Sequence, residues 1–346
     1  MTGTAAAPRD ASGLRPFAVR HFGVSLTAAA ALVAALLVAA ATVGSVSLSP
    51  SEVWDVVVGR SGDRLHRVVV LELRLPRALV AAVAGGMLGL SGATLQSITR
   101  NALAAPELTG VSAGVILLTV VWLAYGPAGT MTGRIVPLVA FIGGVAAAML
   151  AYALSRRGAS DPLRLILAGV LISAILQSAT SLIVLVHQGP TGGVLNWTIG
   201  SLNGRTWSHW GVIWPWAAVT VSATLLSASR VNALQLGDDI AVGLGVRAEA
   251  TRAILLVLSA LLAAGALAVV GAIGFVGLIA PHIARQLVAD DARRLFPFTL
   301  LVGAVVLLGA DVAARAVTNP VELPTGVVTT VLGALFFLRL LTSHSR

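Results

Sequence analysis

The chain has no cysteine and no lysine, and only 11% of its 346 residues are charged. Without cysteine it cannot form a disulfide or a thiolate metal site. Without lysine it cannot hold nucleotide phosphates in the manner of a Walker ATPase loop. An ordinary soluble domain has about 25% charged residues. The chain is therefore neither a soluble domain nor, by itself, a Walker ATPase.

All 23 basic residues are arginine, and they are scattered at the ends of apolar segments. Arginine side chains at helix ends reach the membrane surface, which explains the net charge of +9 without a nucleic-acid partner. We therefore expect these arginines to interact with the lipid bilayer and not with nucleic acid.

Hydrophobic residues make up 57% of the chain, and the mean hydropathy is +0.93. A helix needs roughly 20 mainly apolar residues to cross a bilayer, so the composition predicts an all-α, polytopic membrane protein with about ten transmembrane helices. We expect the spans at residues 24–43, 76–98, 108–125, 135–154, 165–187, 210–229, 251–271, 274–289, 296–317 and 324–342.

The arginines also predict an orientation, because cytoplasmic connections carry the excess of positive charge. With the N-terminus inside, 15 of the 23 arginines fall in cytoplasmic segments. We therefore expect a cytoplasmic N-terminal tail at residues 1–23, a single transmembrane domain at 24–342 and a cytoplasmic C-terminus at 343–346. The apolar run of the first span has the length of a retained membrane helix rather than of a signal peptide.

One group of arginines runs against this pattern, because it precedes the second span on the predicted outer side. Such a group either docks an acidic partner or anchors the chain to lipid headgroups. Its members are Arg60, Arg64, Arg67, Arg74 and Arg77.

A weak internal repeat divides the chain into two halves. Arg77 and Arg252 open similar segments and are 175 residues apart, as are Pro106 and Pro281, which close them. Five spans separate the copies, and an odd number reverses orientation. The pattern predicts inverted repeats of helices 2–5 and 7–10, an arrangement that recurs in transporters.

Charge inside the spans is the usual sign of a transport site, and here it is sparse. Asp311 and Arg315 are four residues apart, so they share a helix face and are expected to pair near the outer end of the ninth span. Ser173, Gln177 and Ser181 form a polar stripe on the fifth span. This stripe either bonds a neighbouring helix or lines a translocation path.

The sequence offers no metal-binding or catalytic arrangement. His282 has no second ligand at metal-binding spacing, and Arg285 on the same turn would repel a cation. The known motifs for hydrolysis are missing too. We therefore predict no metal site, no bound cofactor and no enzymatic activity within the chain.

A polar connection at residues 230–251 joins the two halves on the predicted cytoplasmic side. It contains GDDIAVGLGV, in which Asp238 or Asp239 is expected to cap a short helix that Gly243 and Gly245 end. A short helix beneath a membrane bundle is suited to contact a soluble partner.

Several motifs in family order resemble the FecCD-type permeases, the membrane subunits of type II ABC importers for ferric siderophores, haem or cobalamin. The resemblance covers nearly the whole chain after the first span. The motifs are LRLPRALVAAVAGG at 73–86, SGATLQSITRNALAAPELTGVSAG at 91–114, LILAGV at 165–170, GDDIAVGLGV at 237–246, GAIGFVGLIAPHIAR at 271–285, GADVAAR at 309–315 and ELPTGVVTTVLGALFFLRLL at 322–341.

The resemblance implies a permease dimer, formed with a second copy or a paralogue. It further implies two separate ATPase subunits that use ATP and Mg²⁺, and an extracytoplasmic substrate-binding protein. The location implied is a bacterial cell membrane, with both termini cytoplasmic.

The resemblance also implies roles for particular residues. Arg74, Arg77 and Arg315 match family arginines that dock the binding protein, and the fifth span, with its Ser173, Gln177 and Ser181, matches one that lines the path. The residues that match the family's ATPase-coupling helices are Gly237, Asp238, Asp239, Leu244, Gly245 and Val246.

Among substrates, the segment at 194–207 resembles siderophore permeases more than cobalamin ones, so a ferric siderophore is the leading prediction. Haem or cobalamin import is the alternative within the family. An ion-coupled secondary transporter is the alternative from another class, and the scarcity of intramembrane acids counts against it.

Overall fold

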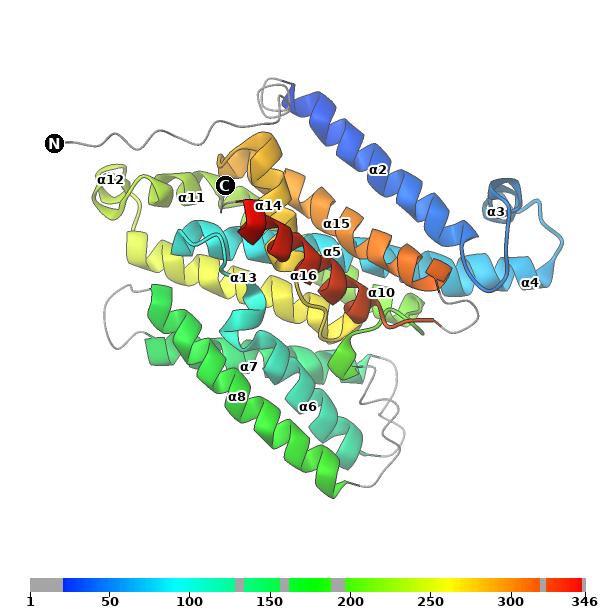
Figure 1. The fold of residues 1–346 in the computed structure, drawn as a ribbon, viewed down its shortest axis with the longest axis horizontal. Coiled ribbons are helices and arrows are strands. Elements are labelled where there is room, and N and C mark those ends of the chain that lie inside the picture. The colour runs from blue at the N-terminus through cyan, green and yellow to red at the C-terminus, as the bar shows by residue number, and fades with distance from the viewer. Residues whose placement is uncertain (1–20, 128–133, 156–161, 188–196, 318–321, 344–346) are drawn as a thin grey trace.

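The computed structural model describes residues 21–127, 134–155, 162–187, 197–317 and 322–343. Within these ranges the chain is helical and contains no strand. The long helices run side by side in one bundle, with α3 and α4 at one end and α12 at the other (Figure 1).

Each of the ten expected spans corresponds to a helix, with ends that differ by a few residues. The helices are α2 (Phe22–Thr42), α5 (Leu75–Thr99), α6 (Val111–Tyr125), α7 (Ile135–Ser155), α8 (Pro162–Val186), α10 (Trp207–Leu226), α13 (Ala248–Val270), α14 (Val276–Val288), α15 (Ala292–Val317) and α16 (Thr325–Ser343). The predicted all-α membrane fold is confirmed.

Not every expected span is long enough to cross a bilayer by itself. Six helices of the described residues meet both the length and the hydropathy that a span requires, or seven if α10 and the short α11 (Ala228–Gln235) form one bent span. The clearest exception is α14, which has 13 residues. Its length of about 20 Å is well below a hydrocarbon core of about 30 Å. The eighth span expected at 274–289 is therefore present as a short helix, which does not cross a bilayer core by itself.

The connection before the second span is largely helical, although no apolar run of span length predicts a helix there. It contains α3 (Pro50–Val57), α4 (Arg64–Arg67) and a π-helix, η1 (Val68–Arg74), and α4 and η1 continue directly into α5. The resulting helix, Arg64–Thr99, has 36 residues. At about 54 Å it is longer than a bilayer core is thick.

The structure supports the predicted inverted repeat. Arg100, just after α5, has a left-handed φ of 51°, and Phe275, just before α14, has a left-handed φ of 67°. These two non-glycine residues are 175 residues apart, the same offset as the sequence repeat. In the repeat, α5, α6 and α7 correspond to α13, α14 and α15. Equivalent pairs pack together in both halves: α5 with α15 and α13 with α7, and likewise α6 with α7 and α14 with α15.

Glycines in the spans allow the helices to approach closely. A Cβ atom on Gly85 would lie 2.3 Å from the carbonyl oxygen of Gly303, and one on Gly92 would lie 1.7 Å from that of Gly277. Both distances are far inside van der Waals contact. These glycines therefore bring α5 against α15 and α14, as small residues do in membrane bundles.

Candidate functional site

Arg77, near the start of α5, is the centre of a buried charged cluster. Its Nε and Nη2 donate to Oδ1 of Asp311 at 3.1 and 2.9 Å, and its Nη1 donates to Oε2 of Glu322 at 2.6 Å. Thr325, the first residue of α16, donates its hydroxyl to the same Asp311 oxygen at 3.2 Å. One guanidinium group thus joins α5, α15 and the segment that leads into α16.

Arg315 and Arg74 extend this cluster to the end of α2. The Nε of Arg315 lies 3.2 Å from Oδ2 of Asp311, which confirms the predicted pairing on one helix face. The Nη1 of Arg315 donates to the carbonyl oxygens of Ala40 and Val43 at 2.9 and 2.7 Å.

Arg74 donates from Nη1 to the carbonyl oxygens of Ala41 and Thr42 at 2.8 and 2.9 Å, and from Nη2 to that of Val46. The last carbonyl groups of a helix lack partners within it, and a cation there interacts favourably with the helix dipole. The two arginines therefore satisfy the C-terminal end of α2.

The three arginines predicted to dock a binding protein are brought together by the fold, and they are buried. Arg74 and Arg77 are each 7% exposed and Arg315 is 5% exposed. Their role as docking residues remains a prediction. What the structure adds is that each guanidinium group already bonds partners within the chain. A docking carboxylate would therefore have to compete with those partners or use the remaining N–H groups.

At the opposite end of the bundle (Figure 1) lies the short helix α12 (Asp238–Gly243). Several of the apolar side chains in and beside it are exposed. Gly237 and Gly245 flank it with φ values of 118° and 80°, a left-handed region that favours glycine. Ala241 is fully buried against the bundle. The side chains of Leu236, Ile240, Val242 and Leu244 are more than half exposed.

Asp238 does not cap α12 as expected, because its side chain makes no capping hydrogen bond. Its carboxylate faces α13 instead. Arg252 donates from Nη1 to Oδ2 at 2.7 Å and from Nη2 to Oδ1 at 2.5 Å, and Nη2 of Arg100 lies 3.5 Å from Oδ1. The hydrogen bonds from Arg252 hold the pKa of Asp238 below its ordinary value of 3.8. Asp239, the next residue, has no ion pair to the described part of the chain.

The predicted path residues all lie on α8. Gln177 and Ser181 are exposed, and Ser173 is half-buried. Large apolar side chains surround them on the same helix, including Ile175 and Leu182. Whether this surface lines a path stays a prediction. A glutamine that faced only lipid would be costly, so the surface is better explained by a further protein contact.

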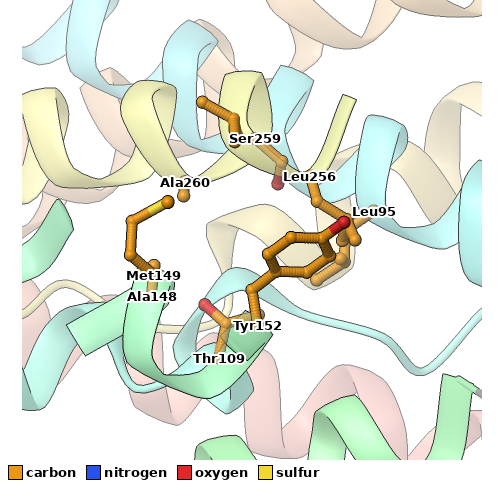
Figure 2. A pocket seen from close by; sticks show the side chains of 9 residues that line it. Leu95, Thr109, Ala148, Met149, Tyr152, Leu256, Ser259 and Ala260 are labelled. Atoms are coloured by element: carbon orange, nitrogen blue, oxygen red, sulfur yellow. The ribbon is translucent and has the colours of Figure 1, made fainter. Parts of the chain in front are cut away.

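The cavity shown in Figure 2 is too small to form a substrate path. It lies where α5, α7 and α13 meet the short 3₁₀-helix η2 (Pro106–Thr109) and has room for little more than a water molecule, about 20 Å³. Its lining is mainly apolar, with the ring of Tyr152 beside the side chains of Leu95 and Thr109 (Figure 2). We regard it as a packing gap between helices.

Glu107 is an acid inside the bundle that no sequence motif marked as a candidate. Both of its carboxylate oxygens are shielded from solvent. Its position in an Ala- and Pro-rich connection between two spans was the available signal. His282, once considered as a metal ligand, packs edge-on against the ring of Phe336, and its Nε2 lies 3.0 Å from Nε2 of Gln286.

A model of the FecCD transport family matches residues 32–343 of the chain. The chain belongs to the FecCD transport family. It is thus a multi-pass helical membrane permease of a family found in ABC importers, and the resemblance inferred from its motifs is confirmed.

Curated members of this family are similar to the chain over most of its length. The Fe(3+)-citrate import system permease protein YfmE of Bacillus subtilis (strain 168) is 33% identical, over 88% of this chain and 90% of that protein. The ferric enterobactin transport system permease protein FepG of Escherichia coli (strain K12) is 34% identical, over 88% and 91%. The achromobactin transport system permease protein CbrC of Dickeya dadantii (strain 3937) is 38% identical, over 86% and 85%.

A solved structure has the same fold. It is described as an inward-facing conformation of a metal-chelate type ABC transporter, and its TM-score to this chain is 0.79 at 28% identity. The match covers 92% of this chain and 98% of that one.

Proposed function

We propose that this chain is the membrane permease subunit of an ATP-binding cassette importer that translocates a ferric siderophore. An extracytoplasmic binding protein would deliver the siderophore, and separate ATPase subunits would supply the energy. The main support is similarity over most of the chain to permeases named for ferric citrate, ferric enterobactin and achromobactin. The missing Walker lysine agrees with ATP hydrolysis on another subunit.

In the proposed orientation, the α12 end of the bundle is cytoplasmic and receives the ATPase. The exposed Ile240, Val242 and Leu244 suit this contact, since a patch of apolar side chains on a soluble face marks an interaction site. Both termini would be cytoplasmic in a bacterial cell membrane. The end with the Arg77 cluster would face outward.

The outer cluster holds three guanidinium groups, those of Arg74, Arg77 and Arg315, against the carboxylates of Asp311 and Glu322. The positive excess suits an acidic surface of the binding protein. Glu322 is the more exposed of the two carboxylates. An incoming carboxylate would therefore exchange most easily with Glu322 for Arg77, and a bidentate contact would then define the register of docking.

A second permease, either another copy or a paralogue, would cover the exposed face of α8. Gln177 and Ser181 on that face would then line a path between the two permeases. This dimer explains why polar side chains occur on a helix whose surface is otherwise apolar and largely exposed.

Transport assays test the function directly. Cells that lack this chain are expected to lose uptake of an iron-loaded siderophore and to regain it when the chain is restored. Loss of haem or cobalamin uptake with unchanged siderophore uptake would replace the substrate assignment. Transport by vesicles that contain this chain alone, driven by an ion gradient, would overturn the ABC assignment.

The docking assignment has its own test, which measures how strongly the binding protein stimulates ATP hydrolysis by the complete transporter. We expect Arg77→Gln to reduce this stimulation in protein that still elutes as a folded complex. The matched control reverses the exposed Arg60, Arg64 and Arg67 to Glu and is expected to keep most of the stimulation. If the control lost the stimulation and Arg77→Gln kept it, docking would instead involve Arg60, Arg64 and Arg67, in and beside α4.

A further inference from the structure

Asp238 connects the exposed helix α12 to the rest of the bundle. The apolar side chains of α12 face away from the bundle, but this carboxylate faces it and makes a two-point contact with Arg252, at the start of α13. A bidentate contact between guanidinium and carboxylate restrains direction as well as distance. Asp238 therefore restrains how α12 is oriented against α13.

The same carboxylate is near the end of α5. Arg100, which follows α5 in a left-handed conformation, places Nη2 3.5 Å from Asp238 Oδ1 and 2.5 Å from the carbonyl oxygen of Leu234 in α11. A single acidic side chain thus meets residues that lie at the ends of α5 and α13. These two helices start the two copies of the inverted repeat.

The helices α5 and α13 are well placed to carry a movement into the bundle. They pack against each other, and at mid-length Ser91 donates its hydroxyl to the carbonyl oxygen of Ser259 at 2.7 Å. The helix α5 continues without a break from Thr99 to Leu75 and bears Arg77 at its other end. A displacement at Arg100 is therefore applied to the same rigid helix that organises the outer charged cluster.

We propose that Asp238 is a positioning residue that couples α12 to both α5 and α13, so that movement imposed on α12 by an ATPase reaches both repeats. This inference rests on the proposed function, in which α12 receives the ATPase. It also changes the role first expected for Asp238, since the carboxylate binds inside the permease and is not a contact for the ATPase. The side chain of Asp238 is 46% exposed, so the ion pairs contribute little to stability, and their effect is on geometry.

The test uses the complete transporter, with ATPase subunits and binding protein, reconstituted in vesicles. The measured quantity is substrate transported per ATP hydrolysed. We expect Asp238→Asn to lower this ratio at least five-fold while the ATPase subunits still copurify with the permease. Arg252→Gln should act in the same direction, and Asp238→Glu, which keeps the charge, should restore part of the ratio.

Two comparisons make the test specific. Glu249→Gln changes an exposed acid in the first turn of α13, one that has no ion pair within the described residues, and should leave the ratio unchanged. The double variant Asp238→Asn with Arg252→Gln should transport as much substrate per ATP as Asp238→Asn alone, because both changes remove the same interaction.

A measurement on the permease alone reports the geometry directly. The chain has no cysteine, so a spin label can be attached at Val242→Cys on α12 without first removing any native cysteine. We expect Asp238→Asn to increase the mobility of this label, and Glu249→Gln to leave it unchanged.

The outcomes separate the inference from the function on which it rests. Should the wild-type complex fail to couple ATP to transport, the proposed function fails and the inference fails with it. A coupled wild type with an unaffected Asp238→Asn variant overturns the inference alone. Loss of the ATPase subunits from Asp238→Asn would overturn it as well, because that result would make Asp238 a direct ATPase contact.

Discussion

The two ends of α5 carry charged clusters built from the same kinds of residue in opposite environments. At the end that faces outward in the proposed orientation, Arg77 and Arg315 share Asp311, whose side chain is fully buried. At the other end, which is the inner one in that orientation, Arg100 and Arg252 share Asp238, which is about half exposed. At both ends, arginine and aspartate side chains from separate helices form ion pairs. The pairs of Asp311 are buried, and those of Asp238 are in contact with water.

This difference decides what each cluster can do. Removing one member of a buried ion pair leaves an uncompensated charge in a low dielectric, which is strongly destabilising. An exposed pair exchanges its partner for water at small cost. The outer cluster is thus suited to hold α2, α5, α15 and α16 in place, and the inner cluster is suited to move.

The largest effect on stability is expected for Asp311→Asn. This change leaves Arg77 with Glu322 and Arg315 with backbone carbonyl groups only. We expect a loss of about 3–5 kcal/mol in the free energy of unfolding, seen as a lower melting temperature of the detergent-solubilised protein. Asp239→Asn at the exposed end is the control, with an expected change below about 0.5 kcal/mol. Equal melting temperatures for the two variants would contradict the comparison.

A smaller loss in the free energy of unfolding is expected for Arg74→Ala, because Arg74 donates to uncharged backbone carbonyl groups and forms no ion pair within the described residues. The carbonyl oxygens of Ala41, Thr42 and Val46 lose their donor. Unsatisfied buried acceptors cost about 1–3 kcal/mol. Faster proteolysis in the segment between α2 and α3 would report this local loosening, whereas Arg64→Ala, at an exposed position, should leave the cleavage rate unchanged.

Glu322→Gln is expected to cost less again, about 1 kcal/mol. Arg77 keeps both hydrogen bonds to Asp311, and the amide oxygen can still accept from Nη1. The melting temperature of this variant should lie between those of wild type and Arg74→Ala. A loss as large as that of Asp311→Asn would show that Glu322, and not Asp311, carries the cluster.

The smallest effect on stability is expected for Asp238→Asn, below about 1 kcal/mol. The pKa of Asp238 is lowered by Arg252. The ion pair between Asp238 and Arg252 therefore contributes its full stability at pH values above the ordinary pKa of Asp238. This contribution is lost only as the pH falls through the lowered pKa that Asp238 has in the folded protein. Transport per ATP in the wild type should accordingly stay constant down to about pH 5. A fall between pH 7 and 5 would assign the pH-sensitive step to another group.

The comparison also shows where sequence patterns were sufficient. All ten apolar segments became helices, because hydrophobic length and helical hydrogen bonding within the segment are local properties. The pairing of Asp311 with Arg315 was predictable for the same reason, since four residues bring two side chains to one helix face. The offset of 175 residues correctly paired the breaks at Arg100 and Phe275.

Other features depended on contacts that no local pattern contains. The sequence assigned no helix to the connection before the second span, but the chain is helical from Arg64. It placed a span at 274–289, but it did not show that α14 has only 13 residues or that the start of α14 packs against η2 and α5. Apolar length alone does not distinguish a helix that crosses the membrane from one that is enclosed by other helices.

The sequence by itself determined that this chain is a helical, multi-pass membrane protein without a Walker ATPase loop, because a bilayer selects for apolar length and that loop needs its lysine. Only the tertiary structure decided which charges are buried. Arg77 and Asp311 are 234 residues apart, and Asp238 meets Arg100 from a different helix. The strength of such pairs is determined by their distance and by their access to water, and both arise only when the helices pack.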